Sequence, residues 1–314
     1  MNRAEERFNE CVRLMQSVTD KDGRPLSMNG LSVCSDGDIF FHQFTSEGSS
    51  ADLRSVSKVI TAIVLGNVID RKIAFEGPSL TLDSPVLEFL GRQANKNISG
   101  LWRNVTIRNL MNNTIGHEEG FLFRKDIGDR AESEYIEYIF EAPIVHAPGT
   151  HFSYSNVGPY LISIILQAVT GRSLLELSRE SVLEPLGATG TWRNFGDFTA
   201  GCTGLVMSCE NLLKIAMVLR DNGSFEGKEV VSAEWVEEMK CPITLTPRMC
   251  DPSRVFPKYA YGLGLWICEN GSFYCDGTNG QYLIVVPSNQ LAISTTGNQP
   301  DMKPITRCML PLLT

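Results

Sequence analysis

The chain has 314 residues, of which 43% are hydrophobic and 20% charged, and its formal net charge is −8 at pH 7. This length and composition indicate a folded protein, either one large domain or two intertwined ones, and exclude a disordered or fibrous chain. The negative charge and the absence of clustered Lys and Arg argue against a nucleic-acid partner.

The N-terminal segment and the longest apolar segment indicate where in the cell we expect the protein. Three glutamates among the first ten residues interrupt the stretch where a secretory signal would need an apolar run. The longest apolar segment, around residues 59–68, is shorter than the ~20 residues that span a bilayer. We therefore expect a cytoplasmic protein with no membrane partner.

Nine cysteines are scattered along the chain without a C-x-x-C pair. An odd number without a regular framework fits reduced thiols better than disulfides. We expect Cys34, Cys202 and Cys209 to pack in the core.

The first elements show clear periodicity. Apolar residues at helical spacing predict an amphipathic helix over residues 4–19. Residues 30–44 then predict two strands joined by a turn at Ser35-Asp36-Gly37. From Asp52 the period changes again, and a helix with Ser55 in its first turn is expected to run to about Asp70.

The rest of the chain predicts helices and then strands. Residues 75–195 are expected to be mostly helical, with one strongly apolar helix ending at Gly171. A further helix is expected over 211–223. Three strand segments, 261–275, 280–287 and 291–298, should return to the first sheet, and a last helical segment lies within 303–313.

Ser55 and Lys58 form an S-x-x-K motif, Ser55-Val56-Ser57-Lys58. A serine hydroxyl needs a base to become a nucleophile, and a lysine can be that base when burial or nearby cations lower its pKa. Residues three apart share a helix face, so Lys58 can reach Ser55 while Ser57 points elsewhere. The helix start also favours an oxyanion at Ser55. Alone, this short motif also fits a capped helix with a surface lysine.

A second constellation, Tyr154-Ser155-Asn156, lies in a loop just before a helix. A phenol near a lysine can titrate low enough to shuttle protons. The alternative interpretation is a tyrosine packed in the core and an asparagine that caps the helix.

Together with a late Gly-rich strand, these motifs resemble the serine β-lactamase and penicillin-binding protein superfamily, particularly its class C-like branch with esterases and nylon-oligomer hydrolases. Residues 53–70 resemble the family's nucleophile helix, 105–117 its LLTHTSG segment, and 148–171 its tyrosine loop and following helix. The resemblance implies an α/β plus all-α architecture, in which an antiparallel sheet flanked by helices carries an inserted helical subdomain. We expect residues 1–74 and 196–314 to form the α/β subdomain and 75–195 the helical one, with the active site at their interface.

The resemblance also implies roles for individual residues. Ser55 would be the acylated nucleophile, Lys58 its proton partner, and Tyr154 the group that exchanges protons with the leaving group and the deacylating water. Asn156 would hold Lys58 and the substrate amide. The backbone N–H groups of Ser55 and Thr278 would bind the oxyanion.

The third motif departs from the family pattern. Cys275-Asp276-Gly277 stands where Lys-Thr-Gly or His-x-Gly is expected. In the family, the first position helps to recognise a substrate carboxylate and tunes the tyrosine. Cys275 therefore casts doubt on β-lactam and D-Ala-D-Ala hydrolysis, whereas the backbone roles of Gly277 and Thr278 do not depend on a side chain.

Other chemistries have weaker support. His117-Glu118-Glu119 lacks the second histidine of a zinc helix, and the chain has no G-x-S-x-G elbow, so we expect no catalytic metal, no cofactor and no Ser-His-Asp triad. Cys275 could be a nucleophile itself, although a strand cysteine is more often a small buried residue.

These observations predict a serine hydrolase that cleaves an amide or ester of a small molecule or short peptide through a Ser55 acyl-enzyme, and not primarily a β-lactamase. Transfer of the acyl group to an amine is an open alternative. So are a catalytically weak binding or regulatory pseudoenzyme and a D-Ala-D-Ala-type peptidase. The sequence does not indicate the substrate or the oligomeric state.

Overall fold

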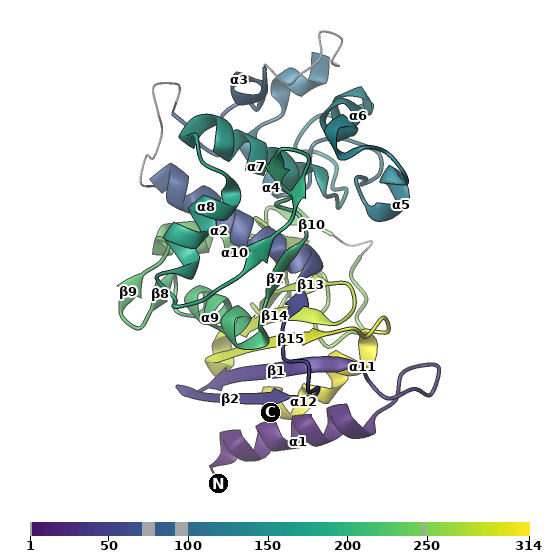
Figure 1. Ribbon diagram of the computed structural model, residues 1–314, viewed down its shortest axis with the longest axis vertical. Helices are drawn as coiled ribbons and strands as arrows, with labels where there is room; N and C mark the ends of the chain where they lie inside the picture. Colours follow the sequence, from purple (N-terminus) through teal and green to yellow (C-terminus); the bar gives the residue numbers. More distant parts are fainter. Residues whose placement is uncertain (1, 71–78, 92–99, 247–248) are drawn as a thin grey trace.

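The computed structural model describes residues 2–70, 79–91, 100–246 and 249–314 (Figure 1). Its largest feature is an eight-stranded sheet in which all neighbouring strands are antiparallel. In spatial order the strands are β10 (Thr244–Leu245), β11 (Ala260–Tyr261), β12 (Trp266–Ile267), β13 (Phe273–Gly277), β14 (Gln281–Val286), β15 (Leu291–Gly297), β1 (Met28–Ser35) and β2 (Asp38–Gln43).

The sheet joins the two ends of the chain. β1 pairs with β15, with Leu31 opposite Thr295, so the predicted return of the late strands to the first sheet is confirmed. The predicted β1–β2 hairpin is also confirmed. Its turn residues Asp36 and Gly37 have φ values of 51° and 89°, the left-handed conformation that such tight turns require.

Helices cover both faces of this sheet (Figure 1). On one face, α1 (Arg3–Ser17) packs with α11 (Lys303–Cys308) and α12 (Leu310–Leu313), and its apolar side is buried. The predicted first and last helices are therefore confirmed, and α1 begins where the Asn2 side chain accepts a hydrogen bond from the Glu5 N–H at 2.8 Å.

The opposite face of the sheet carries α9 (Cys209–Arg220). Helix α2 (Ser57–Asp70) lies in the core. Nearly every side chain of α2 is buried, because α7 (Val157–Thr170), α8 (Leu174–Ser178) and α10 (Ala233–Lys240) surround it. This central helix is the element that carries Lys58.

The middle of the chain supplies the helical region at the top of Figure 1. Helix α7 ends at Gly171, whose φ is 69°, as predicted. The proposed division of the chain at residues 74 and 195 stays a prediction. Among the described residues of this region, the other helical elements are α3 (Leu87–Leu90), η2 (Gly100–Asn104), α4 (Ile107–Met111), α5 (Arg124–Ile127), η3 (Glu132–Glu134), α6 (Tyr135–Glu141) and η4 (Arg179–Leu183).

Short strands complete the structure. β3 (Ala51–Asp52), β7 (Leu205–Met207) and β4 (Thr191–Trp192) form a three-stranded sheet that leads directly into the Ser55 segment. Two hairpins remain, β5 (Asn194–Phe195) with β6 (Phe198–Thr199) and β8 (Ser224–Phe225) with β9 (Lys228–Glu229).

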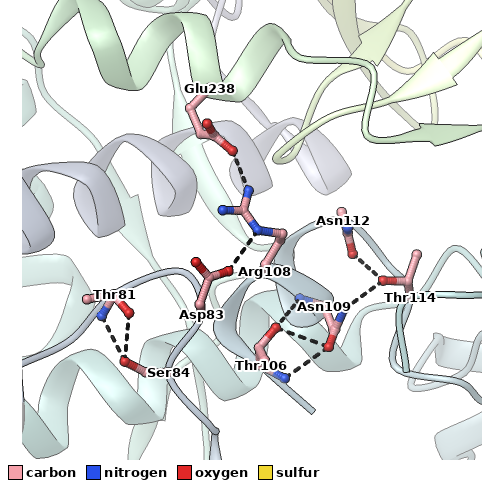
Figure 2. A network of polar contacts seen from close by, with 9 residues as sticks. All are labelled: Thr81, Asp83, Ser84, Thr106, Arg108, Asn109, Asn112, Thr114 and Glu238. Atoms are coloured by element: carbon pink, nitrogen blue, oxygen red, sulfur yellow. Dashed lines mark hydrogen bonds and ion pairs between the residues drawn. The ribbon is translucent and has the colours of Figure 1, made fainter. Parts of the chain in front are cut away.

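A polar network ties α4 to its surroundings (Figure 2). Arg108 of α4 donates to Asp83 at 3.2 Å and also pairs with Glu238 of α10. At the start of α4, Thr106 and Asn109 exchange side-chain to backbone hydrogen bonds in a capping box. These contacts fix the helical region against the elements around α2.

Among the described residues, none of the helices alone has the length and apolar composition of a membrane span. Helix α7 taken together with the segment Leu174–Leu183 passes that test by length and composition, with a bend of 85° between the two parts.

Candidate active site

Ser55 opens onto a cleft of about 740 Å³. Tyr154 and Asn156, from the loop before α7, and Thr278, which follows β13, line the same cleft. The structure thus brings together residues that are more than 200 positions apart in the sequence (278 minus 55). Four of the predicted site residues meet at one surface.

Ser55 lies in η1 (Arg54–Val56), a 3-10 turn that leads into α2. The prediction placed it in the first turn of the helix, whereas α2 begins at Ser57. The tighter turn still puts the Lys58 Nζ 3.0 Å from the Ser55 Oγ. The Ser57 hydroxyl faces away, as predicted, and accepts a hydrogen bond from the Leu205 N–H at 3.3 Å.

Lys58 is almost completely buried, with 1% of its surface exposed. Besides Ser55, its Nζ contacts the Asn156 Oδ1 at 2.7 Å and the Cys202 carbonyl oxygen at 3.1 Å. Burial lowers the pKa of Lys58 from 10.5 to about 8. Both carbonyl oxygens can only accept hydrogen bonds. A neutral Lys58 therefore donates to them and directs its lone pair at the Ser55 hydroxyl.

Asn156 does not cap the helix that it precedes. Its side chain makes no capping bond at the start of α7, and its Nδ2 donates to the Leu122 carbonyl oxygen at 3.0 Å. This bond orients the amide so that its oxygen faces Lys58. The structure therefore supports the contact predicted between Asn156 and Lys58, and not the helix-capping alternative.

Tyr154 differs from the prediction in one respect. Burial, and then the negative charge of Asp276, raise the pKa of Tyr154 well above its ordinary value, so the expectation of a low pKa is wrong. The Lys58 Nζ lies over the ring, 5.0 Å from its centroid, and does not offset the effect of burial. The ring also stacks on Trp266 at 5.3 Å. Tyr154 is therefore protonated and can donate a proton.

The third motif, Cys275-Asp276-Gly277, faces the site with its backbone. The side chain of Cys275 points into the protein core. Cys275 is 3% exposed, does not line the cleft, and donates its thiol to the Gly264 carbonyl oxygen at 3.3 Å. Burial raises the pKa of this thiol, which is the opposite of what a thiolate nucleophile needs. Gly277 packs so closely on the Ser55 segment that a Cβ there would lie 2.3 Å from the Leu53 carbonyl oxygen.

Asp276 is the residue that the sequence reasoning missed. Its carboxylate accepts from the Trp266 Nε1 at 2.9 Å, pairs with the Lys258 Nζ at 3.1 Å, and lies 3.7 Å from Arg254. Trp266 in turn stacks on Tyr154. The signal in the sequence was an acidic residue at the end of an otherwise apolar strand, but its cationic partners could not be identified from spacing.

The Asp276–Lys258 pair predicts a stability effect. Asp276→Asn keeps the shape but leaves Lys258 buried without its counterion, because only 11% of that side chain is exposed. Breaking a buried pair typically costs about 3 kcal/mol of unfolding free energy, which urea denaturation would measure. Glu237→Gln breaks the exposed pair with Lys240 and should cost much less. Equal losses for the two variants would contradict this prediction.

In the part of the chain that the structure describes, no three or more His, Cys, Asp or Glu residues are grouped so that they could hold a metal ion. All nine cysteines lie in that part and are unpaired, and Cys34, Cys202 and Cys209 are buried as expected.

Comparison with known sequences identifies a family model that matches this chain. The family model described as Beta-lactamase matches residues 31–306. A curated relative, the D-aminopeptidase of Brucella anthropi, is 29% identical over 139 residues, which are 42% of this chain and 24% of the relative. The chain thus matches about a quarter of the length of that relative.

Solved structures agree with the fold. EstCE1, titled a hydrolase with promiscuous acyltransferase activity, aligns with a TM-score of 0.77 at 14% identity and covers 99% of both chains. The octameric penicillin-binding protein homologue from Pyrococcus abyssi aligns with a TM-score of 0.71 at 19% identity, over 99% of this chain and 76% of the other. These likenesses confirm the predicted β-lactamase/transpeptidase-like fold. With the family match over most of its length, the chain belongs to the Beta-lactamase family.

Proposed function

We propose that this protein is a serine hydrolase that cleaves an amide or ester bond through an acyl-enzyme on Ser55. One observation carries the proposal. The Ser55 hydroxyl lies 3.0 Å from a buried lysine whose pKa is lowered to about 8 and which also hydrogen-bonds to two carbonyl oxygens. That lysine has a neutral form at accessible pH and one hydroxyl from which it can take a proton.

The reaction follows from this arrangement. Neutral Lys58 takes the Ser55 proton while Oγ bonds to the substrate carbonyl carbon, and the oxyanion that forms is stabilised by the backbone N–H groups of Ser55 and Thr278. As the intermediate collapses, the leaving group takes a proton from the Tyr154 hydroxyl. Lys58 then passes the proton that it took from Ser55 to Tyr154. Water then attacks the acyl carbon and passes one proton through Lys58 and Tyr154 to the Ser55 Oγ. The bond between the acyl carbon and Oγ breaks, which releases the acid and free Ser55.

Two comparisons support the type of bond. One relative is named a D-aminopeptidase, which implies amide cleavage, and one structural neighbour is titled a hydrolase with acyltransferase activity. The buried Cys275 leaves the third motif without the cation or imidazole expected of β-lactam hydrolysis. We therefore propose amides and esters, rather than β-lactams, as the principal substrates.

Intact-mass spectrometry after reaction with a fluorophosphonate probe tests the proposal. Wild type should gain the mass of one probe, because an activated serine attacks phosphorus as it attacks a carbonyl. Ser55→Ala should gain none. Ser57→Ala is the matched control and should still be labelled, since the Ser57 hydroxyl bonds to the Leu205 N–H, away from the cleft.

An adduct on Ser55→Ala equal to that on wild type would refute Ser55 as the nucleophile. Absence of an adduct on both proteins would favour the pseudoenzyme alternative. The same samples, mixed with 4-nitrophenyl acetate, show whether the acyl group is transferred to water.

A further inference from the structure

The cleft carries positive charge although the chain has a net charge of −8. Four cationic side chains and one acidic side chain, Asp52, line it together with Ser55. The cations are Arg54, Arg124, Lys125 and Arg193. A cleft with a net positive charge in a protein with a net negative charge selects ligands by their charge.

Two of these cations are already neutralised. Arg54 pairs with Asp52 at 3.1 Å. Arg193 pairs with Glu132 at 2.6 Å, and its guanidinium lies 5.1 Å from the Phe195 ring centroid. Neither leaves a full charge for a ligand.

Arg124 and Lys125, the first residues of α5, differ from these two. In the described part of the chain, no carboxylate forms an ion pair with either side chain, and both side chains are exposed. Asp126, the neighbouring acid, accepts a hydrogen bond from the Phe123 N–H at 3.0 Å. The Arg124–Lys125 pair is therefore the positive charge of the cleft that is open to a ligand.

The third motif does not supply another such charge. Its first side chain is the buried thiol of Cys275, and the nearby Lys258 pairs with Asp276 and does not line the cleft. The lining of the cleft also includes the apolar residues Leu122, Phe123 and Ile127, and the Phe123 ring stacks on that of Tyr154 at 6.4 Å. The cleft therefore offers hydrocarbon contacts next to Tyr154 and two exposed cations in the same lining.

We propose that the substrate carries a carboxylate, separated by a short hydrocarbon segment from the bond that is cleaved, and that Arg124 and Lys125 bind this carboxylate. This inference rests on the proposed function, because it identifies the bound anion as part of the substrate of Ser55. It assigns the recognition of negative charge to α5 rather than to the third motif.

Three matched esters test the inference. 4-Nitrophenyl butyrate is neutral, 4-nitrophenyl glutarate adds a carboxylate to the acyl part, and 3-carboxy-4-nitrophenyl butyrate adds one to the leaving group. Wild type should prefer at least one anionic ester, relative to its spontaneous hydrolysis, by about tenfold in kcat/KM, because two exposed ion pairs each contribute a few-fold. The preferred ester identifies the end that carries the charge, and added salt should reduce the preference.

In the double variant Arg124→Gln/Lys125→Gln, the ratio of kcat/KM for the preferred anionic ester to kcat/KM for the neutral ester should be close to one. Arg130→Gln is the matched control. Arg130 does not line the cleft and lies near Glu134 at 3.9 Å, so this variant should keep the wild-type preference. Equal kcat/KM for neutral and anionic esters in wild type, or an unchanged preference in the double variant, would overturn the inference.

A binding measurement separates this inference from the proposed function. If wild type hydrolyses none of the esters, the proposed function fails. Calorimetric titration with glutaramate, which carries one carboxylate, and with neutral butyramide then decides whether α5 binds a carboxylate. Glutaramate should bind about tenfold more tightly than butyramide, and only when Arg124 and Lys125 are present. Equal affinities would overturn the inference by this route too.

Discussion

Lys58→Met is expected to lower kcat/KM for 4-nitrophenyl butyrate by about a thousandfold, within the range attributed to general acid–base catalysis. Methionine has nearly the same length but cannot take the Ser55 proton across the 3.0 Å contact. It also leaves the Asn156 and Cys202 carbonyl oxygens without their donor, so a thermal unfolding curve must show that the variant is folded.

The pH dependence of kcat/KM in wild type provides a second test of Lys58 as the base. Burial disfavours the charged form of Lys58, so the neutral base accumulates as pH rises through about 8. Between pH 7 and pH 9, kcat/KM should therefore rise about tenfold and then level off. Lys228→Met, a change at an exposed lysine in β9, should keep the wild-type rate and profile. A flat wild-type profile, or a wild-type rate in Lys58→Met, would exclude Lys58 as the base.

The contact between Ser55 and Lys58 could be predicted because it is local. Three residues of helical or 3-10 backbone place the two side chains together whatever surrounds them. The β1–β2 hairpin was predictable for the same reason, since Asp36 and Gly37 suit its turn. Short-range geometry needs no knowledge of the rest of the chain.

The environment of Tyr154 could not be predicted in this way. Its raised pKa depends on burial and on the charge of Asp276, a residue from a distant strand. The stacking partner Trp266 and the Asp276 partner Lys258 come from further segments again. Residue spacing carries no information about such long-range contacts.

The cationic residues that line the cleft could not be predicted from the sequence for a related reason. Arg54, Arg124, Lys125 and Arg193 lie on three separate segments, and the net charge of −8 gives no sign of them. Which cations remain unpaired is decided by neighbours such as Asp52 and Glu132. Only the folded arrangement distinguishes α5 from the other two segments.

Gly277→Ala is expected to lower kcat/KM by at least about a hundredfold, the effect of losing one oxyanion donor. The added Cβ would lie 2.3 Å from the Leu53 carbonyl oxygen and 3.0 Å from the Arg54 Cβ. The nearest atom belongs to backbone and cannot rotate away, so β13 and η1 must move apart. The N–H groups of Ser55 and Thr278, which we propose bind the oxyanion, lie in η1 and directly after β13, so this movement would separate them.

Overpacking of this kind also costs about 1–3 kcal/mol of unfolding free energy, so rates must be measured well below the unfolding transition. Gly100→Ala is the matched control, because a Cβ there meets no heavy atom within 4 Å. It should change neither rate nor stability. If Gly277→Ala were destabilised yet kept the wild-type rate, the two N–H groups would not act together on the oxyanion. If its rate fell while Lys58 still titrated near its wild-type pKa, the loss would be in oxyanion binding rather than in the base.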